Sequence, residues 1–379
     1  MKKQNPEISI ILPCLNEEQS LGDCLERVKK VIKERKLNAE IVVVDNGSTD
    51  RSCKIAKKKK VIVVYEPERG YGSACLRGFK AAKGKYLFLS DSDGSYDFNE
   101  IPRFIRELKK GFDFVIGDRF KGEVEKGAMS WFHKYIGNPL LSGILRLFFK
   151  TKINDVHCGM RAITKKALSK LDLRAAGMEF ASEMVIQAVK NNLKIKELPI
   201  NYYKRKGISK LKSFRDGWKH LRFMLLYSPL FLFFIPGIIL FLIGLISLVW
   251  LYFGSLKILG IQLQYHPMFL SALLIIIGYQ LMIFALFAKT YAINHLGEKP
   301  SSFNNIYKYL TIEKAGVLGI IIILLGIIIF GVILLNWIKA NFGALQEIKN
   351  SIIALTLIII GIQTIFSSFM LSILGIKKK

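Results

Sequence analysis

Residues 87–95 read Leu-Phe-Leu-Ser-Asp-Ser-Asp-Gly-Ser, an apolar run that ends abruptly in two carboxylates, Asp91 and Asp93. In open α/β sheets, ligands bind at the carboxyl ends of the strands. Two hard oxygen ligands at such an end suit Mg²⁺ or Mn²⁺ carrying a phosphorylated substrate. Asp, Ser and Gly also favour turns, so this stretch alone fits a plain turn equally well. The surrounding sequence decides between the two.

Apolar runs that alternate with helical segments fill the first 200 residues. We expect strands at 7–13, 41–44, 61–65, 86–90, 112–116 and 193–200. Continuous apolar runs are typical of parallel strands that are covered on both faces. Their alternation with helices predicts right-handed βαβ units and a doubly wound, Rossmann-like α/β domain.

Polar side chains repeatedly follow these predicted strands, namely Asn16, Asp45, Asp91 and Arg119. A single Asp after a strand is commonly a helix cap, and Asp50 fits that description. Successive parallel strands bring their carboxyl ends to one edge of the sheet. The repetition therefore predicts an active site at that edge.

Three segments lie between the last two predicted strands. Residues 127–149 are helical and mostly apolar, but Trp131, His133 and Arg146 interrupt the run, which favours an interfacial or groove-lining helix. Residues 155–161 are predicted to form a compact polar turn, and residues 177–192 a helix.

The composition combines 51% hydrophobic residues with a net charge of +27 over 379 residues. Membrane proteins that keep Lys and Arg on the cytoplasmic side often have this combination. No zinc-ligand spacing, RNP-like run or basic heptad helix is present, so nucleic acid is not an expected partner. Anionic membrane lipids and phosphorylated substrates are the expected partners for this charge.

The five cysteines, all in the first half of the chain, form no CxxC motif. An odd number without such spacing favours a reduced, cytosolic domain that has no structural zinc. The apolar run near the N-terminus is too short for a signal peptide. We therefore expect the first domain, residues 1–200, to remain in the cytoplasm.

The second half of the chain is predicted to cross a membrane. Residues 201–228 form a basic loop and an amphipathic helix that suits the membrane interface. Four apolar runs are long enough to span a bilayer, at about 229–252, 267–288, 315–336 and 350–372. Lys and Arg are concentrated in 204–222, in 289–314 and at the C-terminus, so the positive-inside rule places both termini in the cytoplasm. Residues 229–379 would thus be a multi-pass domain with four helices.

The N-terminal motifs resemble those of the family 2 inverting glycosyltransferases, which have the GT-A fold, a mixed, mostly parallel sheet. The resemblance rests on ILPCLNEE at 11–18, VVDNGSTD at 43–50 and Asp91-Ser-Asp93. The stretches 113–119, 155–161 and 205–211 are similar to motifs of the polyprenyl-phosphate glycosyltransferases, of the dolichyl-phosphate mannose or glucose synthase type. The resemblance covers residues 7 to about 227.

The resemblance implies a role for each matching residue. The nucleotide sugar would be bound by Pro13, Asn16, Glu18, Asp45, Ser48 and Asp91. The Mg²⁺ or Mn²⁺ ion would be held by Asp91 and Asp93. The catalytic and lipid-phosphate-facing residues would be Asp93, Arg119, Arg161, Arg205, Ser209 and Lys210. Ser95 stands where a Gln often completes the metal site in the mannose synthases, so UDP-glucose and GDP-mannose both stay open as donors.

The chemistry of such a reaction agrees with the residues present. A polyprenyl or dolichyl phosphate is ionised at neutral pH, because its second pKa is about 6, and needs no strong general base. Approach of a diphosphate to a lipid phosphate needs cations instead, from the metal and from arginine forks. Two rivals remain, a processive polysaccharide synthase and a non-catalytic lipid carrier or flippase. Homo-oligomer formation is left open.

Overall fold

The structure is a computed structural model that describes residues 5–207, 213–254, 256–258, 261–263, 265–295 and 312–375. The chain divides into two compact units, Met1–Met224 and Leu225–Lys379. The boundary between the units along the chain falls near the end of helix α8 (Ser213–Leu226), within the predicted 201–228 connector. The domain borders expected at 200 and 229 stay predictions.

The first unit is built on a seven-stranded sheet with strand order β3-β2-β1-β4-β6-β5-β7. Its strands are β1 (Ile8–Cys14), β2 (Ala39–Asp45), β3 (Ile62–Tyr65), β4 (Tyr86–Leu89), β5 (Phe114–Asp118), β6 (Arg161–Thr164) and β7 (Ile195–Pro199). Only β6 runs antiparallel to its neighbours. This is the mixed, mostly parallel sheet that the GT-A resemblance implies.

Strand β6 is the one strand of this sheet that the sequence did not predict. It occupies the end of the predicted polar turn, and its four residues are too few to show a periodic pattern. It lies between β4 and β5, where Arg161 is paired with Leu89 on one side and with Ile116 on the other. Arg161 therefore begins a central strand instead of standing in an exposed turn.

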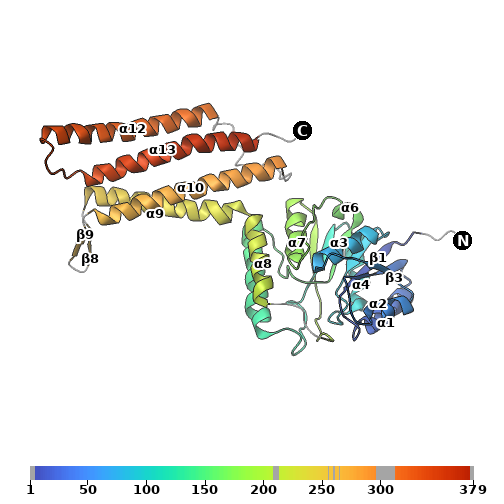
Figure 1. The fold of residues 1–379 in the computed structure, drawn as a ribbon. Coiled ribbons are helices and arrows are strands. Elements are labelled where there is room, and N and C mark those ends of the chain that lie inside the picture. The colour runs from blue at the N-terminus through green and yellow to red at the C-terminus, as the bar shows by residue number, and fades with distance from the viewer. Residues whose placement is uncertain are drawn as a thin grey trace. The chain divides into compact units, whose positions relative to one another are not determined.

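Helices cover the sheet of the first unit (Figure 1). They are α1 (Leu21–Glu34), α2 (Ser52–Lys58), α3 (Tyr71–Ala81), η1 (Phe98–Glu100), α4 (Ile101–Lys109), η2 (His133–Gly137), α5 (Asn138–Phe149), α6 (Lys165–Leu168) and α7 (Phe180–Lys190). In α1 the apolar residues Leu21, Leu25 and Val28 recur at helical spacing and are fully buried. Gly72 at the start of α3 packs so tightly that a Cβ there would lie 1.9 Å from the carbonyl oxygen of Ala175.

Large side chains of residues 131–149, which include η2 and α5, are exposed on the surface of the first unit. Trp131 is 68% exposed, Tyr135 59% and Leu147 63%. The predicted interfacial or groove-lining segment is thus helical from residue 131 to residue 149, with an aromatic and aliphatic surface that the rest of this unit leaves uncovered.

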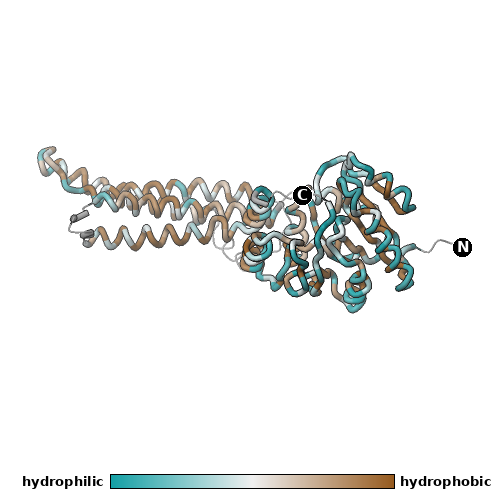
Figure 2. The backbone as a smooth tube through the Cα atoms, turned by 90° about the horizontal axis from the view of Figure 1, so that it is seen from below, coloured by the Kyte–Doolittle hydropathy of each residue, from teal (hydrophilic) through white to brown (hydrophobic). Residues whose placement is uncertain are grey.

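The second unit contains four helices that are long and apolar enough to cross a membrane, among the residues that the structure describes. Its elements are η3 (Leu230–Phe234), α9 (Ile235–Phe253), β8 (Leu256–Ile258), β9 (Ile261–Leu263), α10 (His266–His295), α12 (Ile312–Lys339) and α13 (Ile348–Gly375). The candidate spans are Leu230–Phe253, His266–Asn294, Glu313–Lys339 and Ile348–Gly375. They confirm the four predicted runs, and Figure 2 shows the long helices as predominantly hydrophobic.

Glycines allow the candidate spans to pack closely in two pairs. In α9 and α10, a Cβ on Gly278 would lie 2.6 Å from the carbonyl oxygen of Gly237. In α12 and α13, a Cβ on Gly361 would lie 2.7 Å from the carbonyl oxygen of Gly319. Small residues at such crossings let helix backbones approach each other within a bilayer.

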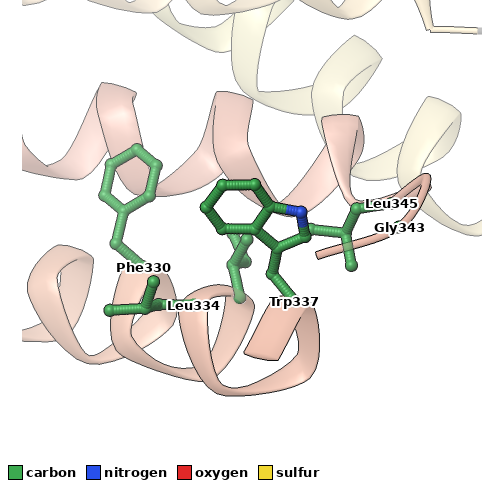
Figure 3. A pocket seen from close by; sticks show the side chains of 6 residues that line it. Phe330, Leu334, Trp337, Gly343 and Leu345 are labelled. Carbon is green, nitrogen blue, oxygen red and sulfur yellow. The ribbon is translucent and has the colours of Figure 1, made fainter. Parts of the chain in front are cut away.

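An apolar pocket of about 320 Å³ lies at the end of α12 (Figure 3). Its lining consists of Phe330, Ile333, Leu334, Trp337, Gly343 and Leu345. All of these residues come from α12 or the turn that follows it, and none has a charged side chain. The pocket lining therefore offers no charged side chain to a phosphate or a metal ion.

Candidate active site

The carboxylates of Asp91 and Asp93 follow β4 at the edge of the sheet where β1, β2 and β5 also end. The turn is fixed from both sides. The Ser92 hydroxyl donates a 2.7 Å hydrogen bond to the carbonyl of Pro13, and the Ser95 amide donates a 3.0 Å bond to Oδ1 of Asp93. Ser95 is fully buried and its hydroxyl also bonds Oδ1, so this serine orients Asp93.

The two carboxylates repel each other. Burial, and next the negative charge of Asp93, raises the pKa of the Asp91 carboxyl to about 7. A side-chain hydrogen bond from Tyr71 and the positive charges of Arg119 and Arg205 oppose this rise. The backbone at Gly159 packs directly on Asp91, since a Cβ there would lie 2.4 Å from Oδ2.

Arg205 lies between the carboxylates of Glu17 and Asp93. Its Nη2 donates a 3.2 Å hydrogen bond to Oε1 of Glu17, and its Nη1 lies 3.6 Å from Oδ2 of Asp93. The next residue along the chain, Lys206, donates its amide to the carbonyl oxygen of Asp93 at 2.9 Å. The basic segment after β7 thus contacts the turn that carries Asp91 and Asp93.

The two carboxylates fit a divalent cation that takes its other ligands from a substrate. Among the described residues, no group of three or more His, Cys, Asp or Glu side chains could hold a metal by itself. Mg²⁺ is commonly bound by one or two carboxylates together with substrate phosphates and water. The raised pKa of Asp91 and the guanidinium beside Asp93 show that a positive charge is favourable here.

The loops after β1 and β2 are joined by hydrogen bonds. The Asn16 amide donates to the Ser48 hydroxyl at 3.0 Å, and the Ser48 amide donates to Oδ1 of Asp45 at 3.0 Å. Asp45 is only 7% exposed. The Glu18 carboxylate accepts hydrogen bonds from the backbone and the side chain of Arg51. The structure therefore brings Pro13, Asn16, Glu18, Asp45 and Ser48 together at the predicted edge.

Asp50 also acts within this loop. Its Oδ1 accepts a 2.9 Å hydrogen bond from the amide of Ser52 at the start of α2, and its Oδ2 accepts one from the amide of Glu18. Helix α2 begins at Ser52 and its N-cap position is Arg51, so Asp50 bonds the turn before the helix and is not the N-cap residue that the sequence suggested.

Arg119 is held by a partner that the sequence did not identify. Its Nε and Nη2 donate hydrogen bonds of 2.6 and 2.8 Å to the two oxygens of Asp155, which is fully buried. Its guanidinium also lies 5.1 Å from the ring centre of Tyr202. Arg119 itself is 7% exposed. Arg119 contributes positive charge near Asp91. Its paired N–H groups already donate to Asp155, so they do not face a phosphate as the sequence predicted.

Arg161 lies in the core, which corrects the predicted position. Its guanidinium donates hydrogen bonds to three backbone carbonyls, those of Cys158, Ala181 and Val156, at 2.7, 2.8 and 2.7 Å. Its side chain is only 1% exposed. Because it begins the central strand β6, the side chain tethers the 156–158 loop and α7, and we leave it out of the proposed acceptor site.

Two predicted site residues, Ser209 and Lys210, lie outside the described residues. Conversely, the structure adds Glu17, Tyr71 and Asp155 to the site. Glu17 follows the predicted Asn16, but its link to Arg205 crosses 188 positions and leaves no local pattern. Asp155 lies in a segment predicted to be a turn, and the sequence gives no sign that it pairs with Arg119.

All five cysteines are free thiols. Burial raises the pKa of Cys14 to about 11 and that of Cys158 to about 12, so neither is a thiolate at neutral pH. The side chains of Cys14 and Cys158 are buried in the core and offer no nucleophile to the site.

Comparisons with known proteins agree with the fold and the strand-end motifs. The sequence profile of glycosyl transferase family 2 matches residues 9–172, and that of the glycosyltransferase family 2 C-terminal transmembrane region matches residues 286–375. The chain is 36% identical over 371 residues to the low-salt glycan biosynthesis hexosyltransferase Agl6 of Haloferax volcanii, covering 98% of this chain and 89% of that protein.

Two further proteins are similar to part of the chain. A dolichyl-phosphate hexose transferase of the same organism is 28% identical over 212 residues, which cover 56% of this chain and 89% of that protein. The solved structure of glucosyl-3-phosphoglycerate synthase from Mycobacterium tuberculosis is 21% identical, with a TM-score of 0.49 over 60% of this chain and 81% of that one. The chain is therefore a membrane-protein member of glycosyltransferase family 2, with a GT-A domain followed by the family's C-terminal transmembrane region.

Proposed function

We propose that this glycosyltransferase moves one hexose from a nucleotide sugar to a polyprenyl or dolichyl phosphate at the cytoplasmic membrane face, with inversion. The observation that carries the proposal is the pair Asp93 and Arg205, whose charged atoms lie 3.6 Å apart. Asp93 lies in the turn that follows β4, and Arg205 belongs to the basic segment that precedes the juxtamembrane helix α8 in the sequence. Donor and acceptor chemistry thus meet at one point.

The donor side would bind the nucleotide diphosphate. Asp45, Asn16 and Ser48 lie in joined loops that suit a base and ribose, while Asp91 and Asp93 would hold Mg²⁺ or Mn²⁺. When bound, the cation would neutralise charge that develops on the leaving diphosphate. Ser95 and Ser92 keep the two carboxylates in place for this task.

The acceptor side would bind the lipid phosphate through Arg205. An arginine fork binds phosphate oxygens through paired hydrogen bonds. The acceptor is its own nucleophile because a phosphomonoester, with its second pKa near 6, is largely ionised at neutral pH. In-line attack from the face opposite the leaving diphosphate then inverts the sugar.

Membrane placement supports a lipid acceptor. Exposed Trp131, just before η2, and Tyr135, on η2, suit the headgroup region of a bilayer, and the high net positive charge suits anionic lipids. The positive-inside pattern favours a cytoplasmic catalytic domain and cytoplasmic termini. The names of two relatives, a hexosyltransferase and a dolichyl-phosphate hexose transferase, support a hexose and a polyprenyl-type acceptor.

The test is a transfer assay with membranes that contain the full chain, a polyprenyl phosphate and a panel of labelled nucleotide sugars, UDP-glucose and GDP-mannose among them. We expect label in a lipid that carries one sugar. A growing polymer would indicate a processive synthase instead. Nucleotide binding without transfer to any lipid, in the presence of Mg²⁺ and Mn²⁺, would indicate a non-catalytic carrier.

A further inference from the structure

A buried polar contact joins the juxtamembrane helix α8 to the catalytic unit. Nδ1 of His220, on α8, lies 2.9 Å from the hydroxyl of Ser182 on α7. The same hydroxyl lies 3.2 Å from Nε2 of His157. The two imidazole rings meet edge to face with centroids 4.5 Å apart. His220 is 7% exposed and Ser182 is fully buried.

The chemistry of this trio suits two neutral rings. A serine hydroxyl has one proton to donate, so it donates to one imidazole nitrogen and accepts from an N–H of the other ring. Burial lowers the pKa of His157 well below its ordinary value, and lowers that of His220 to about 4. Nδ1 of His157 is buried without a hydrogen-bond partner among the described residues. The hydrogen bond of this ring is therefore the one that Nε2 makes with Ser182.

His157 stands in the middle of the loop that shapes the candidate active site. Two residues before it, Asp155 binds the fork of Arg119. Two residues after it, Gly159 packs against the carboxylate of Asp91 and donates its amide to the Tyr96 hydroxyl at 2.8 Å. A shift of the His157 ring would therefore move both the partner of Arg119 and the wall behind Asp91.

We propose that His220 is a positioning residue for sugar transfer, which makes α8 a part of the active-site scaffold. The contact from His220 through Ser182 to His157 fixes the 155–159 loop, and with it Arg119 and Asp91. The helix that leads into the first candidate span thereby also sets the geometry of the catalytic loop. The kinetic part of this inference rests on the proposed transfer reaction, whereas the structural part does not.

The first test needs no substrate. Amide hydrogen exchange is compared for the full-length protein in detergent, for wild type, His220→Leu and His220→Asn. Leu keeps much of the volume and removes the hydrogen bond, whereas Asn keeps a polar atom near the position of Nδ1. We expect exchange at Gly159 to rise roughly tenfold or more in His220→Leu, with His220→Asn close to wild type and β1–β2 peptides unchanged.

Ser182→Ala provides a second variant if His220→Leu folds poorly. It removes the hydroxyl between the two rings, so the same local rise is expected. An unchanged 155–161 segment in both folded variants would overturn the proposal. A rise spread evenly over the whole first unit would overturn it as well, because that result indicates a general loss of stability.

The second test is kinetic. A misplaced active-site wall lowers turnover without weakening distant nucleotide contacts, so kcat of His220→Leu should fall about tenfold with KM for the nucleotide sugar unchanged. His220→Asn should restore most of kcat. An equal loss in both variants, or a rise in KM alone, would overturn the proposal. If the wild type transfers no sugar to lipid, the proposed function fails, and hydrogen exchange still decides the positioning role.

Discussion

The two sides of the candidate site are built differently. On the donor side, the loops after β1 and β2 are joined by backbone amides that donate to neighbouring side chains, as between Asn16, Ser48 and Asp45. On the other side, arginine side chains make the contacts. Arg119 pairs with Asp155, and Arg161 donates to three carbonyls. Arg205 differs from both, because its guanidinium faces Asp93.

The difference separates arginines that support the site from an arginine that can meet a substrate. A guanidinium that already donates to both oxygens of a carboxylate, or to three carbonyls, has few N–H donors left for a phosphate. Arg205 makes longer contacts, 3.2 Å to Glu17 and 3.6 Å to Asp93. Its segment precedes the juxtamembrane helix α8 in the sequence. The following changes test this division.

The largest effect is expected at the donor carboxylates. Asp93→Asn keeps the shape of the side chain and removes the charge that would hold the cation, so kcat should fall on the order of a thousandfold. Transfer of labelled sugar measures the loss. Asp172→Asn, on an exposed carboxylate paired with Arg174, is the matched control and should retain activity. Retained turnover in Asp93→Asn would contradict the metal assignment.

The next effect concerns stability at Arg161. Arg161→Met leaves three buried carbonyls without their donor, which should lower the free energy of unfolding by about 3–5 kcal/mol. Thermal unfolding in detergent measures it. Arg174→Met is the control, because that side chain is 69% exposed and should change stability little. A stable Arg161→Met protein with a raised KM for lipid phosphate would restore the predicted substrate role.

Acid should weaken the first unit through His220. Burial lowers its pKa from about 6.5 to about 4, so the unfolded chain binds the proton first as pH falls. The contribution of neutral His220 to the free energy of unfolding is fully present above pH 6.5. It is lost between pH 6.5 and 4, by up to about 3 kcal/mol. Glu179 and Asp216 oppose the shift, whereas Arg161 and Lys219 add to it.

Comparison of unfolding at pH 7 and pH 4.5 for wild type and His220→Asn isolates this contribution. The variant cannot take up the proton, so it should lose less stability than the wild type. Parallel losses in both proteins would show that other groups cause the acid sensitivity.

The smallest effect is expected at Arg205. Arg205→Gln removes a charge-assisted phosphate contact worth about 2 kcal/mol, so KM for the polyprenyl phosphate should rise roughly thirtyfold. KM for the nucleotide sugar should change less. Arg205→Lys keeps the positive charge but lacks the paired N–H donors. Its KM for the polyprenyl phosphate should lie between those of the wild type and Arg205→Gln. A rise confined to the nucleotide-sugar KM would place Arg205 on the donor side instead.

Local patterns carried most of the fold prediction. Strands β2 and β4, which lead to Asp45 and Asp91, are continuous apolar runs. Both pair in parallel with β1, Asp45 with Cys14 and Leu89 with Ile11, so their ends lie at one edge, as predicted. The four candidate spans follow from composition alone. Strand β6 was missed because four residues after a polar turn show no periodicity.

The partners of the arginines could not be predicted for a related reason. Arg161 lies in the core only because β6 is inserted between β4 and β5. The pairs Arg205 with Glu17 and Arg119 with Asp155 join residues 188 and 36 positions apart, a separation at which spacing carries no signal. The type of residue needed at the site was therefore predictable, whereas the choice among arginines required the tertiary structure.

The most direct measurement is hexose transfer by the purified full chain in liposomes that contain a polyprenyl phosphate, before and after chelation of divalent cations. The account predicts that labelled hexose enters a lipid carrying one sugar, that chelation stops the transfer, and that Mg²⁺ or Mn²⁺ restores it. Transfer that continues unchanged after chelation, or a product that is a polymer, would contradict it.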